Sequence, residues 1–147
     1  APPVPPPDLA ELWPAGNFSC GVVFLDNPPF GTYNVGVAAD PTVDATRIGY
    51  SLFWEISEEL GTFVKGGILV VEQKNYNEAT FVLGTTDSNV TQGAPGAAQT
   101  NPQPGYTMNK TNSFAGTQWY AKAFVQYTDV NGVLQTVYSD MIAVEKI

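Results

Sequence analysis

Apolar and polar residues alternate along much of this chain with a period of two, the pattern of a strand that buries one face. The clearest alternation runs from Arg47 to Ile56 and places five large apolar residues on one face: Ile48, Tyr50, Leu52, Trp54 and Ile56. Shorter runs of β-branched and aromatic residues predict six more strands, at Phe18–Leu25, Tyr33–Ala38, Thr62–Glu72, Thr80–Leu83, Thr117–Thr128 and Val133–Ser139. Turn residues separate these runs, and Asp40-Pro41 ends the second strand.

The strand pattern predicts an all-β fold, an antiparallel β-sandwich with one core, because no convincing long helix is present. Asn131-Gly132 lies between the last two strands and is a strong signal for a hairpin that joins them. We expect the core to contain the apolar residues that share the inward faces: Tyr50, Leu52, Trp54, Ile68, Val70, Trp119, Ala123 and Val125.

Two segments depart from this pattern. Residues 1–16 are an extended Pro-rich N-terminal arm in which five of the first eight residues are proline, a composition typical of polyproline conformation. Within the arm, Asp8–Trp13 could form one helical turn. Residues 17–147 form the sandwich domain, and residues 87–105 are expected to be one long surface loop because they almost lack large apolar side chains.

Composition narrows the range of functions. The 147 residues fit a single domain, and a hydrophobic content of 44% is that of a globular protein. With 6 basic and 14 acidic residues the net charge is −8, so we expect no nucleic-acid partner, since phosphate binding needs clustered Lys and Arg. No apolar run approaches the roughly 20 residues of a transmembrane helix, and we expect no membrane insertion.

The chain contains no histidine, so neither a Ser-His-Asp nor a Cys-His catalytic arrangement can be built from it. Cys20 is the only cysteine, which excludes an internal disulfide, and its apolar neighbours predict a buried, inert thiol. We therefore predict that the protein is not an enzyme and holds no cofactor. A paired-carboxylate glycosidase is the disfavoured alternative, with four candidate carboxylates: Glu55, Glu58, Glu59 and Glu72.

Residues 116–125 (GTQWYAKAFV) are followed by Tyr127-Thr128-Asp129, by Asn131-Gly132 and by residues 136–140 (TVYSD). This stretch resembles the last two strands of a fibronectin type III or related immunoglobulin-like domain of bacterial surface or phage structural proteins. Residues 63–69 (FVKGGIL) are similar to the central strand of that family. Trp119 stands where many members have a corner tyrosine, and its indole N–H can donate but not accept a hydrogen bond. The resemblance implies an immunoglobulin-like sandwich that serves as a spacer, adhesive or decoration module.

In the strand predicted at Thr117–Thr128, the alternation that buries Trp119 turns Tyr120 and Phe124 outward. Three interpretations stay open: the N-terminal arm covers this pair, another subunit contacts it, or the rings stack on carbohydrate. Stacking on carbohydrate would need a coplanar row of exposed aromatic side chains, for which four candidates are available: Tyr76, Tyr106, Tyr120 and Phe124.

Other polar positions have more general interpretations. Three sequons make N-glycosylation possible at Asn17, Asn89 and Asn109. Five aspartates lie mostly in predicted turns, and we expect them to form turn hydrogen bonds and no metal site: Asp40, Asp44, Asp87, Asp129 and Asp140.

These observations predict a non-enzymatic structural or adhesive module of an extracellular assembly, either a virion decoration or fibre protein or a subunit of a cell-surface filament. We assign docking onto other copies or a host scaffold to the arm, through Pro2, Pro3, Pro5, Leu9, Leu12 and Trp13. Proline lowers the entropy lost when such an arm docks. The alternative is a carbohydrate-binding module of a secreted enzyme or adhesin, with a glycan partner. Either function places the protein outside the cell, on a virion or cell surface, and Ala1 fits signal-peptide cleavage or Met removal.

Overall fold

The computed structural model describes residues 16–23, 31–93 and 99–147. The N-terminal arm and its predicted docking residues therefore lie outside the described residues. The strands are β1 (Gly16–Val23), β2 (Gly31–Asp44), β3 (Arg47–Ile56), β4 (Gly61–Glu72), β5 (Thr91–Gly93), β6 (Gln103–Lys110), β7 (Gln118–Asp129), β8 (Leu134–Tyr138) and β9 (Ile142–Glu145). The described part has one helical segment, the 3-10 turn η1 (Gln73–Asn75), and no helix in it could cross a membrane.

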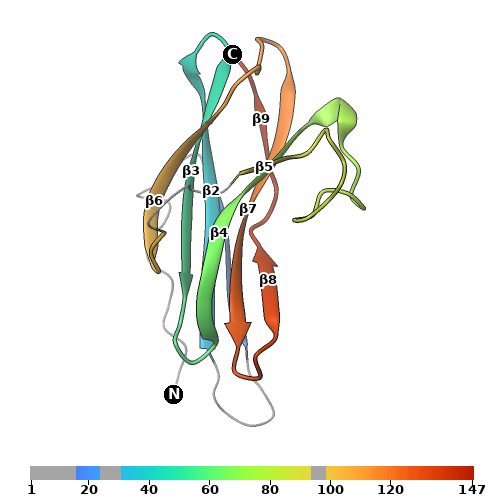
Figure 1. The fold of residues 1–147 in the computed structure, drawn as a ribbon. Coiled ribbons are helices and arrows are strands. Elements are labelled where there is room, and N and C mark those ends of the chain that lie inside the picture. The colour runs from blue at the N-terminus through green and yellow to red at the C-terminus, as the bar shows by residue number, and fades with distance from the viewer. Residues whose placement is uncertain (1–15, 24–30, 94–98) are drawn as a thin grey trace.

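The strands form two antiparallel sheets that pack face to face (Figure 1). One sheet has the order β1-β2-β3-β6, and the other has the order β5-β4-β7-β8. β9 also pairs with β7, beyond the end of β8. The chain crosses from one sheet to the other after β3, after β5 and after β6. The predicted all-β antiparallel sandwich is thereby confirmed at the level of its two sheets.

Strong alternation locates strands well. β3 has the bounds that the pattern of Arg47–Ile56 predicts, and β4 and β7 each lie within one residue of theirs. β2 continues beyond the predicted end at Asp40-Pro41 and reaches Asp44, with a shift of register between Asp40 and Asp44. The bulge lets the ladder accommodate Pro41, which has no N–H to donate.

Two expectations between β4 and β7 are wrong. Thr80–Leu83 is a turn and not a strand, because the N–H groups of Thr80 and Phe81 both donate to the Asn77 carbonyl, at 3.1 and 3.0 Å. Residues 87–105 are not one continuous loop, since they contain β5 and the start of β6. Neither strand has an alternating sequence, and each is held by pairing with a stronger neighbour, β4 or β3.

The main core lies between the two sheets and contains every residue predicted for it. Trp54 is fully buried at its centre, where its ring stacks on Phe63 at a centroid distance of 6.0 Å. Gly66 of β4 permits this position, because a Cβ there would lie 2.6 Å from the indole ring. β3 and β4 thus approach closely at the point where the largest core side chain sits.

Residues 99–101 tie the two sheets together with side-chain amides. Gln99 bonds to both the N–H and the carbonyl of Gly66 in β4, at 3.0 and 3.2 Å. Asn101 bonds to the N–H and carbonyl of Ile56 in β3, at 2.9 and 2.8 Å. Between them, the Thr100 carbonyl accepts the indole N–H of Trp54 at 2.9 Å. We call these three residues the amide strap.

The predicted hairpin is present and its turn contains one left-handed residue. β7 and β8 pair from Thr128↔Leu134 to Phe124↔Tyr138. Gly132 has φ of +81°, and its N–H donates to the Asp129 carbonyl at 2.9 Å. The turn is therefore a type I turn followed by a glycine bulge, in place of a two-residue turn with both residues left-handed.

Replacing Gly132 by Val should lower the free energy of unfolding by about 1 kcal/mol or more, because a β-branched residue is strained at this φ. A Cβ at Gly132 would meet nothing within 4 Å, so the whole effect is conformational. Gly132→Asn is the matched control and should cost less, since Asn tolerates the left-handed region. Urea unfolding with equal losses for both variants would contradict this reason.

Candidate functional site

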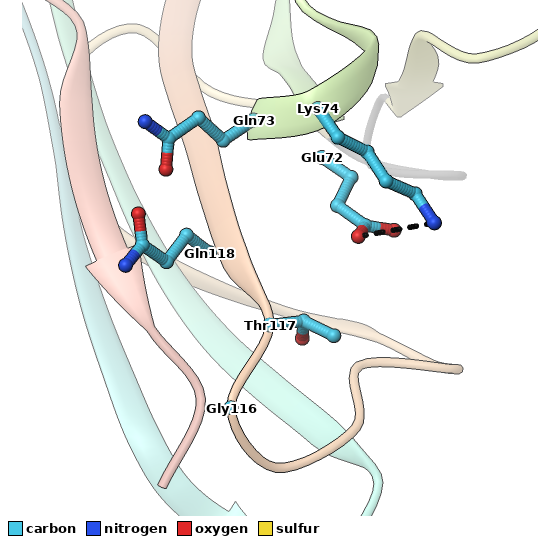
Figure 2. Close-up of a pocket in the computed structure, with 6 residues that line it drawn as sticks. All are labelled: Glu72, Gln73, Lys74, Gly116, Thr117 and Gln118. Carbon is cyan, nitrogen blue, oxygen red and sulfur yellow. Dashed lines mark ion pairs between the residues drawn. The ribbon is translucent and has the colours of Figure 1, made fainter.

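A polar pocket of about 480 Å³ opens where β4 ends and β7 begins. Its lining comes from η1 and from the chain that enters β7: Glu72, Gln73, Lys74, Gly116, Thr117 and Gln118. The amides of Gln73 and Gln118 lie on one side, and the Glu72–Lys74 ion pair lies on the other (Figure 2). Amide, carboxylate and ammonium groups around one opening can exchange hydrogen bonds with a small polar ligand.

The charges around this pocket remain solvated. Lys74 and Glu72 are 3.7 Å apart, but the Lys74 side chain is 72% exposed, so the pair contributes little to stability. Lys110 lies nearby, with its Nζ 5.1 Å from the centre of the Trp119 ring. Partial burial lowers the pKa of Lys110, and the Glu72 carboxylate opposes that shift. The lining can hold a small polar ligand by hydrogen bonds.

A hydrogen-bond relay fixes the wall of the pocket at the start of β7. The indole N–H of Trp119 donates to the Thr117 hydroxyl at 2.8 Å, and that hydroxyl donates to the Phe114 carbonyl at 2.6 Å. A corner tyrosine would reach an upstream backbone group with its own hydroxyl. Here Trp119 reaches the upstream Phe114 carbonyl only through the Thr117 hydroxyl.

The predicted exposed aromatic surface is not exposed. Phe124 is only 1% accessible and Tyr120 is half-buried, because residues 76–90 of the same chain lie over this face of the second sheet. The covering side chains pack with β4 and β7 into a second, smaller core: Tyr76, Phe81, Leu83 and Val90. We call residues 76–90 the cover segment. Within the described residues, the cover segment accounts for the burial of Phe124.

Lys122 and Tyr138 fasten the cover segment to the sheet. The Lys122 ammonium lies 4.8 Å from the centre of the Phe81 ring and 4.3 Å from that of Tyr138. The Tyr138 hydroxyl accepts the N–H of Leu83 at 3.0 Å. Burial lowers the pKa of Lys122, while the nearby Glu78 raises it. Cation–π contacts of this kind stabilise a partly desolvated lysine without a carboxylate partner.

The candidate rings do not form a coplanar row. Tyr76 meets Tyr120 edge to face, with the rings inclined by 82° and their centres 5.1 Å apart. Such an edge-to-face contact is a packing arrangement, and a sugar ring cannot stack on both rings at once. The side chain of Tyr106 lies outside what the structure describes. Sequence reasoning missed the cover segment because its few apolar residues follow no period.

Cys20 is exposed, so the expectation of a buried thiol is wrong. Cys20 lies in β1 opposite Asn34, on the face of the sheet that points away from the main core. Partial desolvation raises the pKa of its thiol, which keeps it protonated at neutral pH. Apolar residues next to Cys20 in the chain alternate between the two faces of β1, so they do not cover its side chain.

Four of the five predicted turn aspartates form turn hydrogen bonds within the described residues. Each of four carboxylates accepts the backbone N–H two residues further on, at 2.9–3.0 Å: Asp40, Asp44, Asp87 and Asp129. These bonds lower the pKa of each of the four carboxyl groups. In the described ranges no group of three or more potential ligands is placed to hold a metal ion.

The structure describes the asparagine side chains of two of the three predicted glycosylation sequons. Asn89 and Asn109 are both exposed, Asn89 in the cover segment and Asn109 in β6. The side chain of Asn17 lies outside the described residues. The four candidate glycosidase carboxylates lie on separate elements or turns, in β3, in the turn after it and at the end of β4: Glu55, Glu58, Glu59 and Glu72.

The described residues define a two-sheet, all-β antiparallel fold that is compatible with an immunoglobulin-like sandwich. Its surface carries an open polar pocket and an uncharged edge strand, β1. Comparisons with protein-family models, with curated proteins and with solved structures find no match to this chain. Its function must therefore be inferred from its own residues.

Proposed function

We propose that this protein is a non-enzymatic structural or adhesive module of an extracellular assembly, a virion decoration or fibre protein or a subunit of a cell-surface filament. In this proposal residues 1–13 dock onto another copy or onto a host scaffold. One observation carries the proposal: the Pro-rich arm leads directly into β1, which is an edge strand of the first sheet. An arm that starts at an edge strand can extend away from its own domain without breaking any pairing inside it.

The strand order supports a fibronectin type III-like assignment within this proposal. With β1 set aside, β2, β3 and β6 take the places of strands A, B and E in an immunoglobulin-like sandwich. β4 and β7 take the places of C and F, β5 lies beside C as an added C′ strand, and β8 with β9 forms G. β1 would then be an additional strand at the edge beside A. Modules of this architecture commonly serve as spacers and adhesive units.

Deleting residues 1–13 should leave a folded domain that no longer assembles or attaches. The deletion retains the whole of β1 and its pairing with β2, so the thermal midpoint should stay close to that of the full chain. Negative-stain microscopy and light scattering of the purified native material and of the deletion variant measure the assembly. If the arm only covers its own domain, the deletion will instead lower the midpoint and increase binding of a hydrophobic dye while assembly persists.

The polar pocket favours carbohydrate binding as the second candidate function. Facing amides such as those of Gln73 and Gln118 suit sugar hydroxyls, although no ring in the lining offers a stacking surface. A polysaccharide pull-down distinguishes the two functions. Retention that is lost on replacing both glutamines by Ala would favour this alternative over the structural module.

A further inference from the structure

β1 differs from the other sheet edges in its regularity. Among the described strands it pairs with β2 alone, and its eight residues pair one for one, from Gly16↔Ala38 to Val23↔Gly31, without a shift of register. A long, regular edge strand presents a row of free N–H and carbonyl groups that can pair with another strand. Proteins usually interrupt such an edge with bulges, prolines or charges.

The other three edges carry such interruptions. β5 is only three residues long. β6 contains Pro104 and Lys110, and its pairing with β3 shifts register between Leu52 and Trp54. The edge formed by β8 and β9 is broken between Tyr138 and Ile142, and Glu145 lies near its end. Of the edges that the structure describes, β1 is thus the one without these features.

The surroundings of β1 lack charge in a chain whose net charge is −8. No charged residue occurs in β1, or in β2 before Asp40. Two copies repel one another wherever their acidic surfaces meet, and an uncharged edge adds nothing to that repulsion. Cys20 and Val22 are both exposed on it, Val22 to 37%.

We propose that β1 is a homodimer interface, in which the β1 strands of two copies pair antiparallel across a twofold axis and join their first sheets into one. An antiparallel pair of identical strands is self-complementary, so each copy offers and receives the same groups. The chain's own arm is a poorer occupant, because its prolines have no N–H to donate to a ladder. This interface does not depend on the docking function proposed for the arm.

Sedimentation equilibrium of the full chain over a range of concentrations tests the proposal. We expect a reversible dimer whose dissociation constant rises at least tenfold in Val22→Lys, because a charged lysine on an edge strand opposes the addition of a second strand. Val22 is exposed, so the variant should keep the thermal midpoint of the wild type. Leu134→Lys is the matched control: Leu134 is 55% exposed on the edge strand β8, and its replacement should leave dimerisation unchanged.

Cys20 provides a second readout because it lies near the middle of β1. If the twofold axis passes through the middle of β1, the two Cys20 residues lie directly opposite each other or one pair apart in the ladder. Their Cβ atoms are then about 5–8 Å apart. A short bis-maleimide should therefore join two wild-type or Leu134→Lys chains and should not join Val22→Lys chains. A chain that stays monomeric, a Val22→Lys variant that dimerises as the wild type does, or a Cys20 that the reagent cannot reach would each overturn the proposal.

Discussion

Truncating Trp54 to Ala is expected to lower the free energy of unfolding by about 3–5 kcal/mol, the largest loss from any single core change in this chain. The indole is fully buried between Phe63 and Gly66, so its removal leaves a cavity that neither neighbour can fill without moving its strand. The Thr100 carbonyl also loses its hydrogen-bond donor. Denaturant unfolding followed by circular dichroism measures the effect.

Two further variants separate the causes. Trp54→Phe keeps most of the ring volume but removes the indole N–H, so its loss should be clearly smaller than that of Trp54→Ala. Leu134→Ala truncates an exposed side chain and should change stability by less than about 0.5 kcal/mol. A loss below about 1 kcal/mol for Trp54→Ala would show that this face of β3 is not the core face.

Replacing Asn101 by Ala should destabilise the domain by about 2–4 kcal/mol. The Asn101 side-chain amide accepts a hydrogen bond from the N–H of the buried Ile56 and donates one to its carbonyl. Each backbone group that is left without a partner costs about 1–3 kcal/mol. β3 would lose the contacts that its last residue makes with the amide strap. The same denaturant titration, with an unchanged slope, measures the loss.

Asn101→Asp is the informative control for the strap. Its carboxylate can still accept the Ile56 N–H but cannot donate to the Ile56 carbonyl, and it places a negative charge beside that oxygen. We expect Asn101→Asp to be destabilised as well, and to recover partly at acid pH, where a protonated carboxyl can donate. If Asn101→Ala were neutral, water would be satisfying Ile56 and the strap would not hold the two sheets.

Much of the fold can be predicted from local sequence. In β3, for example, the residues that face the main core are apolar at every second position. Ile48 to Ile56 alternate without a break on the inward face, and the strand begins and ends where the alternation does. The β7–β8 hairpin could also be predicted from the sequence, since Asn131-Gly132 marks the turn and Gly132 takes the left-handed conformation. In both cases the signal lies within a few neighbouring residues.

Other parts depend on contacts between distant segments and leave no local period. β6 has a sequence of mixed polarity, and pairing with β3 makes it a strand. Thr80–Leu83 has strand-like residues, but hydrogen bonds that it donates to the Asn77 carbonyl and the Asp87 carboxylate fix it as a turn. The outward direction of Phe124 was predictable; its burial under residues 76–90 was not. The polar pocket was likewise missed, because no spacing links Gln73 to Gln118.

The cover segment also determines how the molecule should open under native conditions. β4 and β7 are covered on both faces, by the main core on one side and by Phe81 and Val90 on the other. Amide hydrogens at Leu69 and Phe124 should therefore exchange with solvent only through global unfolding, whereas those of β9 should exchange through local fraying. The central pair of the second sheet is then the most slowly exchanging part of the described domain, and the ends of its shorter strands can fluctuate without loosening it.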